Sequence, residues 1–117
     1  MNREFRYTGP LIALIAVEKL THYLLVKRPV GDKSDFLKQA GYAIDNPRRL
    51  EEDIRTQILS QEATPIETTD YGELFEIKGT LVGPNGTALK VKSVWMEEWE
   101  TGATKFITLY PDKGETQ

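Results

Sequence analysis

The chain has 117 residues, of which 39% are hydrophobic and 28% charged, and its formal net charge is −3. This length predicts a single domain, with an ordered core over about residues 11–111. An acidic chain is not drawn as a whole to nucleic acid, so RNA binding would need a local basic patch, and DNA is not an expected partner. The sequence contains no cysteine, which excludes disulfides and thiol catalysis and favours a cytoplasmic location.

Membrane, metal and cofactor sites lack their usual sequence signals. The longest apolar run, Leu11 to Val17, is far shorter than the ~20 residues that a membrane-spanning helix needs. No glycine-rich phosphate loop precedes a helix, and one histidine without cysteine does not supply the ligands of a zinc site. We therefore expect no membrane partner, no metal and no cofactor.

The first third of the chain predicts a short strand and two helices. The run from Leu11 to Ile15 favours a strand, and residues 18–25 carry apolar side chains three and four positions apart, which is typical of a helix. A second helix is expected over residues 33–40. Asp32 is well placed as its N-cap and Gly41 as its left-handed C-cap.

The third and longest predicted helix begins at Asn46-Pro47 and runs to about residue 59. Proline suits the first helical position, and the side-chain oxygen of Asn46 is expected to cap the helix by accepting a backbone N–H bond. The inward stripe repeats every four residues, at Leu50, Ile54 and Ile58. An acidic trio near the helix N-terminus suits the helix dipole: Glu51, Glu52 and Asp53.

The second half of the chain predicts an antiparallel meander with strands at about 73–82, 87–97 and 104–110. Asn85-Gly86 between the first two is a strong hairpin signal. An edge strand near Ile66 would make a fourth. Alternation predicts one buried face: Phe75, Ile77, Leu89, Val91, Trp95, Ile107 and Leu109. The fold class is therefore α+β, with an N-terminal short strand and three helices packed on a three- to four-stranded C-terminal meander.

Two sets of residues are candidates for function. On the strands, the parity opposite the core carries Lys90, Lys92, Thr108 and Tyr110, which form either an exposed sheet face or a surface for a ligand. Val94, Phe106 and Tyr110 would also form an apolar patch there. Nearer the N-terminus, a basic cluster comprises Lys27, Arg28 and Lys33, and His22 is the one histidine. Together with Lys90 and Lys92, these three basic residues are the candidates for binding phosphate or RNA.

Several stretches resemble a family of small bacterial domains found as stand-alone proteins and as C-terminal modules of polymorphic toxins. In chain order they are Glu18-Lys19-Leu20-Thr21, Tyr23-Leu24-Leu25, Lys33, Phe36, Gly41-Tyr42, Asn46-Pro47, Leu50, Pro84-Asn85-Gly86, Val91-Lys92-Ser93-Val94-Trp95 and Lys105-Phe106-Ile107-Thr108-Leu109-Tyr110-Pro111. The layout of helices followed by a meander is similar to the ribonuclease toxin superfamily that includes barnase, EndoU-like and RelE-like nucleases.

The resemblance implies one of two functions. A toxin-like ribonuclease would cleave RNA without a metal, with Lys33, Lys92, Thr108, Tyr110 and His22 as the candidate catalytic groups and an antitoxin-like protein as its partner. Alternatively, a non-enzymatic module on the same scaffold would dock another small protein through its edge strand or through the patch of Val94, Phe106 and Tyr110. The second reading is favoured by the net acidity and by Arg28, which stands where toxin-type members often carry a histidine.

Overall fold

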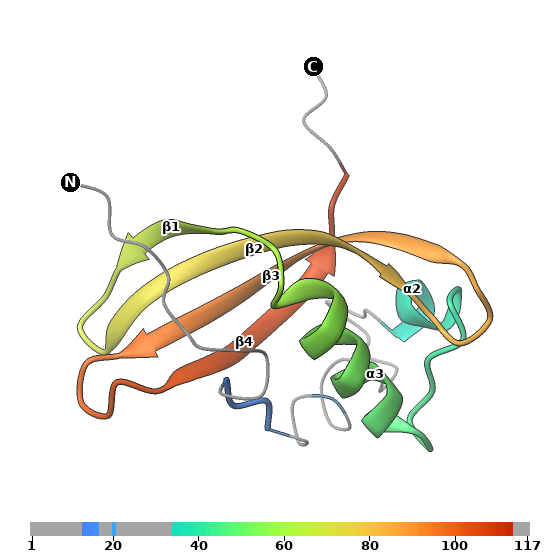
Figure 1. The fold of residues 1–117 in the computed structure, drawn as a ribbon, viewed down its shortest axis with the longest axis horizontal. Helices are drawn as coiled ribbons and strands as arrows, with labels where there is room; N and C mark the ends of the chain where they lie inside the picture. Colours follow the sequence, from blue (N-terminus) through green and yellow to red (C-terminus); the bar gives the residue numbers. More distant parts are fainter. Residues whose placement is uncertain (1–12, 17–19, 21–33, 114–117) are drawn as a thin grey trace.

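A computed structural model describes residues 13–16, 20 and 34–113 of the chain (Figure 1). The elements in chain order are α2 (Ser34–Lys38), α3 (Pro47–Asp53), the π-helical turn η2 (Ile54–Ile58), β1 (Ala63–Thr68), β2 (Gly72–Val82), β3 (Ala88–Glu98) and β4 (Thr104–Pro111). The α+β class is confirmed. Of the expected N-terminal strand, the structure describes one parallel bridge between Leu14 and Lys105. The helix expected over residues 18–25 lies outside the described residues except for Leu20.

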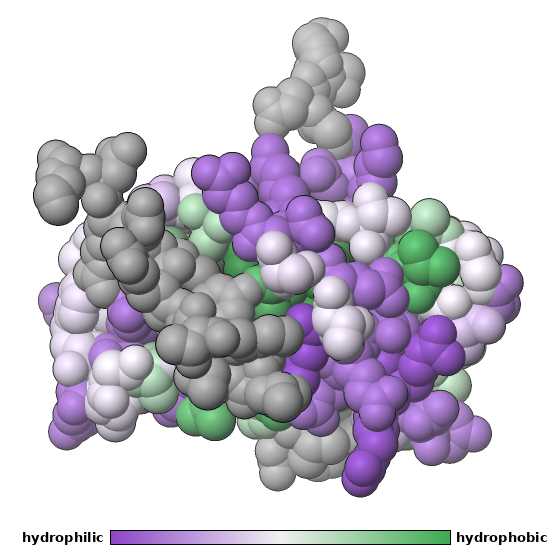
Figure 2. All heavy atoms as spheres, viewed as in Figure 1, coloured by the Kyte–Doolittle hydropathy of each residue, from purple (hydrophilic) through white to green (hydrophobic). Residues whose placement is uncertain are grey.

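The strands form one antiparallel sheet in the order β1-β2-β3-β4. The three predicted strands of the meander and the edge strand near Ile66 are confirmed. Gly86 has a φ of 89° in the turn between β2 and β3, a conformation that favours glycine. Figure 1 shows α2 and α3 on the same side of the sheet. Hydrophilic residues cover most of the described surface over α3 (Figure 2).

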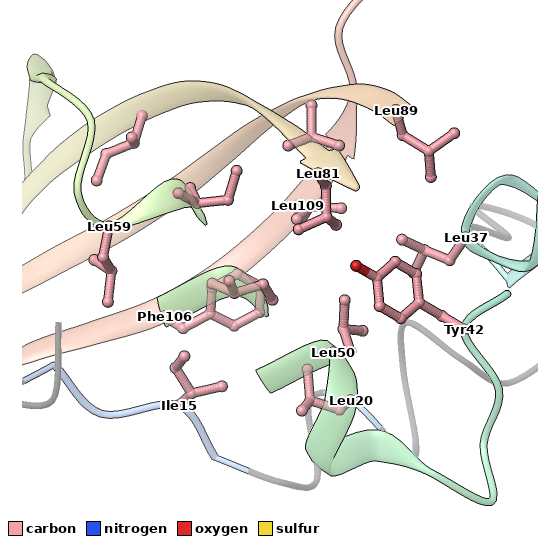
Figure 3. Packing of buried hydrophobic residues seen from close by; sticks show 14 of the residues in the cluster. Ile15, Leu20, Leu37, Tyr42, Leu50, Leu59, Leu81, Leu89, Phe106 and Leu109 are labelled. Carbon is pink, nitrogen blue, oxygen red and sulfur yellow. The ribbon is translucent and has the colours of Figure 1, made fainter. Parts of the chain in front are cut away.

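The core lies between this side of the sheet and the helices (Figure 3). Six of the seven residues predicted to be buried on the strands are buried: Phe75, Ile77, Leu89, Val91, Trp95 and Leu109. The prediction for Ile107 is wrong, because a bulge pairs Trp95 with Phe106 and Val94 with Thr108 and leaves Ile107 between them. Phe106 therefore enters the core at 3% exposure, and Ile107 is half-buried.

The two described helices begin close to their predicted positions, but α3 ends at Asp53, and only the π-helical turn η2 continues to Ile58, close to the predicted end. Gly41 follows α2 with a φ of 93°, as expected of a left-handed C-cap. Pro47 opens α3, but the predicted side-chain cap is wrong, because Asn46 makes no side-chain cap hydrogen bond. Its backbone carbonyl instead accepts the N–H of Arg49 at 3.3 Å. The helix then widens into η2, where the N–H of Leu59 bonds to the carbonyl of Ile54, five residues earlier.

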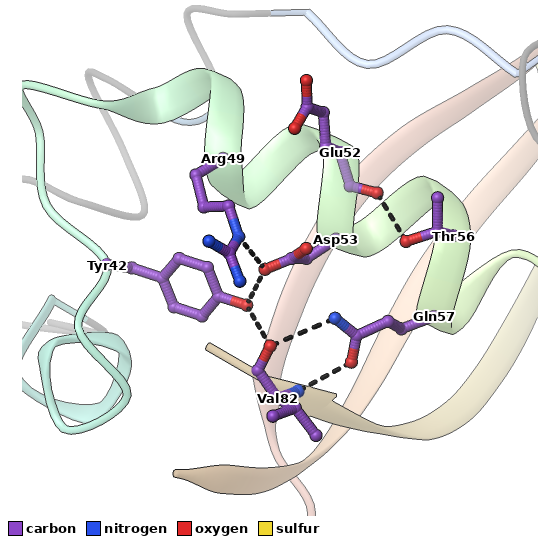
Figure 4. A network of polar contacts seen from close by, with 7 residues as sticks. All are labelled: Tyr42, Arg49, Glu52, Asp53, Thr56, Gln57 and Val82. Atoms are coloured by element: carbon purple, nitrogen blue, oxygen red, sulfur yellow. Dashed lines mark hydrogen bonds and ion pairs between the residues drawn. The ribbon is translucent and has the colours of Figure 1, made fainter. Parts of the chain in front are cut away.

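A buried polar network joins the helices to the end of β2 (Figure 4). The hydroxyl of Tyr42 donates to Oδ2 of Asp53 at 2.7 Å, and Nε of Arg49 donates to the same oxygen at 2.9 Å. Nearby, the side-chain amide of Gln57 donates to the carbonyl of Val82 at 3.1 Å and accepts its N–H at 2.7 Å. The expectation that Glu51, Glu52 and Asp53 serve the helix N-terminus is wrong, since α3 has no acidic residue in its first turn and Asp53 closes the helix as a buried acceptor.

The network predicts a loss of stability at alkaline pH. Burial, then the hydrogen bond from its hydroxyl to Asp53 and the charge of that carboxylate, raise the pKa of Tyr42 well above its ordinary value of 10.0. A group whose pKa is raised in the folded state stabilises the fold below its unfolded pKa and loses that contribution as the pH rises further. Between pH 8 and pH 11, the free energy of unfolding measured in urea should fall less in Tyr42→Phe than in the wild type. An equal fall in both proteins would contradict this assignment.

Candidate functional site

One face of the sheet is left uncovered by α2 and α3 (Figure 1). Its central row comprises Lys78, Lys92 and Tyr110, because Lys92 pairs with Lys78 on one side and with Tyr110 on the other. The next row comprises Glu76, Val94 and Thr108. Directly paired residues of an antiparallel sheet point to the same side. We call this surface, defined by Glu76, Lys78, Lys90, Lys92, Thr108 and Tyr110, the open face.

The lysines give the open face a local positive charge. Lys78 and Lys90 are exposed and Lys92 is half-buried. Lys78 and Lys92 lie directly opposite each other across two strands, so two cationic side chains are concentrated at one place on the face. Among the residues that the structure describes, Lys90 and Lys92 make no ion pair. Their ammonium groups are therefore available to an anionic partner.

Tyr110 and Glu76 add a hydroxyl and a carboxylate to the lysines. The Tyr110 hydroxyl lies 3.5 Å from Oε2 of Glu76, a long hydrogen bond. Partial burial, followed by the nearby charges of Glu76 and Asp112, raises the pKa of Tyr110. The phenol therefore remains protonated at neutral pH, and it is a hydrogen-bond donor rather than a base.

The structure brings together the strand residues that the sequence singled out, namely Lys90, Lys92, Thr108 and Tyr110. His22, Lys27, Arg28 and Lys33 lie outside the described residues. Sequence reasoning missed Glu76 and Lys78. Counting outward from the Asn85-Gly86 turn would have placed Lys78 opposite Lys92, which is the signal that could have identified it.

The expected apolar patch of Val94, Phe106 and Tyr110 is not present on the open face. Phe106 is on the core side because of the bulge, and its ring packs edge-on against Trp95 at a centroid distance of 5.2 Å. Val94 has 9% of its surface exposed. Tyr110 therefore stands beside lysines rather than within an apolar cluster, and any partner of this face would be recognised mainly by polar groups.

A pocket of about 480 Å³ lies beside β4, lined by Leu14, Ile15, Ala16, Arg55, Lys105, Phe106 and Ile107. Both of its cations are already engaged. Arg55 bonds to the carboxylate of Glu51 at 3.0 Å and to the carbonyl of Ala13 at 2.6 Å, and Lys105 pairs with Glu98 at 2.8 Å. Such a lining offers an apolar ligand contact surface but no free charge that would orient it.

Neither a metal cluster nor a spanning helix is found in the part of the chain that the structure describes. Within residues 13–16, 20 and 34–113, no three histidine, aspartate or glutamate side chains gather as a metal site would require. The helices over the same residues are too short and too polar to cross a bilayer.

Comparison with known proteins gives a family and no established activity. Residues 11–113 match the model of a family described as a domain of unknown function, DUF6883. No curated protein matches the chain, and no solved structure does. The match covers most of the chain, including every strand and both described helices.

Proposed function

We propose that the chain, which belongs to the family of domains of unknown function DUF6883, is a non-enzymatic module that binds a small acidic protein through its open face. One observation carries the proposal. Lys90 and Lys92 present ammonium groups without ion-pair partners among the described residues, beside Tyr110, on a sheet face that α2 and α3 leave uncovered.

The chemistry of these groups suits recognition. Tyrosine contributes contact area and a hydrogen bond at a low cost in side-chain entropy, and it is enriched at protein interfaces. Lysines at such a surface steer an oppositely charged partner and raise the association rate more than the final affinity. The central row presents the ammonium donors of Lys78 and Lys92 and the hydroxyl of Tyr110, whose raised pKa keeps it protonated at neutral pH. Acceptors on an acidic protein surface complement it.

The resemblance to C-terminal toxin modules supports a protein partner of antitoxin type. Toxin-type members are produced together with a neutralising protein, and we propose that a non-enzymatic module on the same scaffold keeps a partner of this type. The product of a gene adjacent to the one for this chain is therefore the first partner to test.

The test is a binding measurement with purified proteins. The double charge reversal Lys90→Glu, Lys92→Glu should weaken binding of the neighbouring gene product by at least about tenfold, and the wild-type affinity should fall with added salt. The double reversal Lys38→Glu, Arg48→Glu is the matched control, because it changes the net charge equally at exposed residues of α2 and α3, on the other side of the sheet. Binding that tolerates the reversal at Lys90 and Lys92 as well as it tolerates the control would contradict the proposal.

A second candidate, a metal-independent ribonuclease, is favoured by a different observation. The Glu76 carboxylate lies 3.5 Å from the Tyr110 hydroxyl, in the row next to Lys92. A carboxylate is able to accept the proton of a ribose 2′-hydroxyl, and a lysine stabilises charge developing on the phosphate. Wild-type protein that degrades cellular RNA in the presence of a chelator, with loss of this activity in Glu76→Gln, would favour the nuclease. If the wild-type protein leaves RNA intact, the nuclease candidate is rejected and only the binding module remains.

A further inference from the structure

The end of the sheet away from the Asn85-Gly86 turn carries two exposed aromatic side chains. The turn between β1 and β2 and the turn between β3 and β4 lie together at this end (Figure 1). Tyr71, in the first turn, is 77% exposed, and Trp99, in the second, is 47% exposed. Trp95, the other tryptophan, is fully buried, so exposure is a property of this position and not of tryptophan in this chain. We call this region the aromatic end.

Hydrogen bonds fasten the two turns to each other. The backbone N–H of Trp99 donates to the carbonyl of Tyr71 at 3.1 Å, and its indole Nε1 donates to the carbonyl of Thr69 at 3.1 Å. The hydroxyl of Thr69 in turn accepts the N–H groups of Tyr71 and Gly72, each at 3.1 Å. The indole is thus fixed in place while about half of its surface stays in water. Binding of a partner would therefore cost little side-chain entropy at this indole.

The charge around the aromatic end is strongly negative. Residues 67–73 and 97–105 contain six acidic residues (Glu67, Asp70, Glu73, Glu97, Glu98 and Glu100) and one basic residue, Lys105. Lys105 is engaged with Glu98 at 2.8 Å. Asp70 and Glu100 are exposed and make no ion pair within the described part of the chain. The field here is opposite in sign to that of the open face.

We propose that the aromatic end is a second docking surface, which binds a lysine- or arginine-rich segment of a partner protein. Cations bind to the faces of tryptophan and tyrosine rings, and nearby carboxylates strengthen the attraction. An ordered, half-exposed tryptophan is also typical of the residues that dominate binding energy at interfaces. This site is separate from the open face, so the module would join an acidic partner to a basic one.

The test uses fluorescently labelled hexalysine as the probe and fluorescence anisotropy as the readout. Tyr71→Ala and the double variant Asp70→Asn, Glu100→Gln should each weaken hexalysine binding about threefold to tenfold. Tyr71 is so exposed that its removal leaves the fold intact. The matched control is Asp45→Asn, Glu52→Gln, which neutralises two exposed carboxylates elsewhere and changes the net charge equally. It should change binding less than twofold.

Three results would overturn the proposal. The first is that hexalysine binding does not saturate. The second is that the control pair weakens hexalysine binding as much as the Asp70→Asn, Glu100→Gln pair does. The third is that labelled hexaglutamine binds as tightly as hexalysine. A fourth concerns a different occupant. If the protein self-associates, and both the Lys90→Glu, Lys92→Glu variant and the Asp70→Asn, Glu100→Gln variant abolish this self-association, the aromatic end binds the open face of a second copy. The idea of a separate basic partner then fails, whereas the open face remains a binding surface.

Discussion

Replacing Trp95 with alanine is expected to lower the free energy of unfolding by about 3–5 kcal/mol, the range for a large buried aromatic residue. The side chain is fully buried, and its ring meets that of Phe106 edge-on, at 70° between the ring planes. Its indole Nε1 also donates to the Ser93 hydroxyl at 2.8 Å, and that hydroxyl donates to the Ile77 carbonyl at 2.9 Å. Alanine would leave a cavity in the core on the helix side of the sheet.

The matched control is Trp99→Ala. Trp99 is 47% exposed, and its indole makes one hydrogen bond, so its loss should cost about 1 kcal/mol. Urea unfolding followed by far-ultraviolet circular dichroism gives both values without relying on tryptophan fluorescence. Equal losses for the two variants would mean that Trp95 does not anchor the core.

The sheet was predictable because its signals are local. Alternation of apolar and polar residues fixes the faces of β2 and β3, and Asn85-Gly86 fixes the turn between them. The bulge in β4 was not predictable from such a pattern. Phe106 and Ile107 are adjacent and both apolar, so nothing in the sequence indicates which one enters the core. The choice depends on the ring packing between Phe106 and Trp95, a contact between strands.

The residues of the candidate site were likewise predictable only where the signal lies within one strand. Lys92 and Tyr110 were assigned to one face by the parity of their own strands. Glu76 lies beside them only because of the register of a third strand. The aromatic end depends on contact between two turns, where the hydrogen bond from Trp99 to Thr69 joins residues 30 positions apart in the sequence. Contacts of that kind are made by the tertiary structure, so single-strand patterns do not reveal them.

Polar groups on the helices were misjudged for a related reason. Asn46 has the residue type of an N-cap, but its backbone angles of φ −141° and ψ 62° accompany a carbonyl bond to Arg49 and no side-chain bond. Asp53 has the residue type of a surface acid and is 7% exposed. It is buried because Tyr42, from the segment after α2, packs over it.

Replacing Asp53 with alanine is therefore expected to lower the free energy of unfolding by about 2–4 kcal/mol, more than any other acidic substitution on α3. Hydrogen bonds to a charged group contribute roughly 1.5–3 kcal/mol, and a buried hydroxyl left without an acceptor costs about 1–3 kcal/mol. Asp53 accepts from both Tyr42 and Arg49. Without it, the Tyr42 hydroxyl keeps only the Val82 carbonyl, 3.4 Å away. Arg49, whose side chain is 40% exposed, would regain water and soften the loss.

A double-mutant cycle isolates the contact. Glu52→Ala, at the neighbouring exposed position on the same helix, should cost under about 0.5 kcal/mol and controls for the change of residue type. If the hydroxyl of Tyr42 is the group left unsatisfied, Asp53→Ala should cost clearly less in a Tyr42→Phe background than in the wild type. Additive losses would show that Tyr42 and Asp53 stabilise the protein independently. The network would then not be what fastens the segment after α2 to α3.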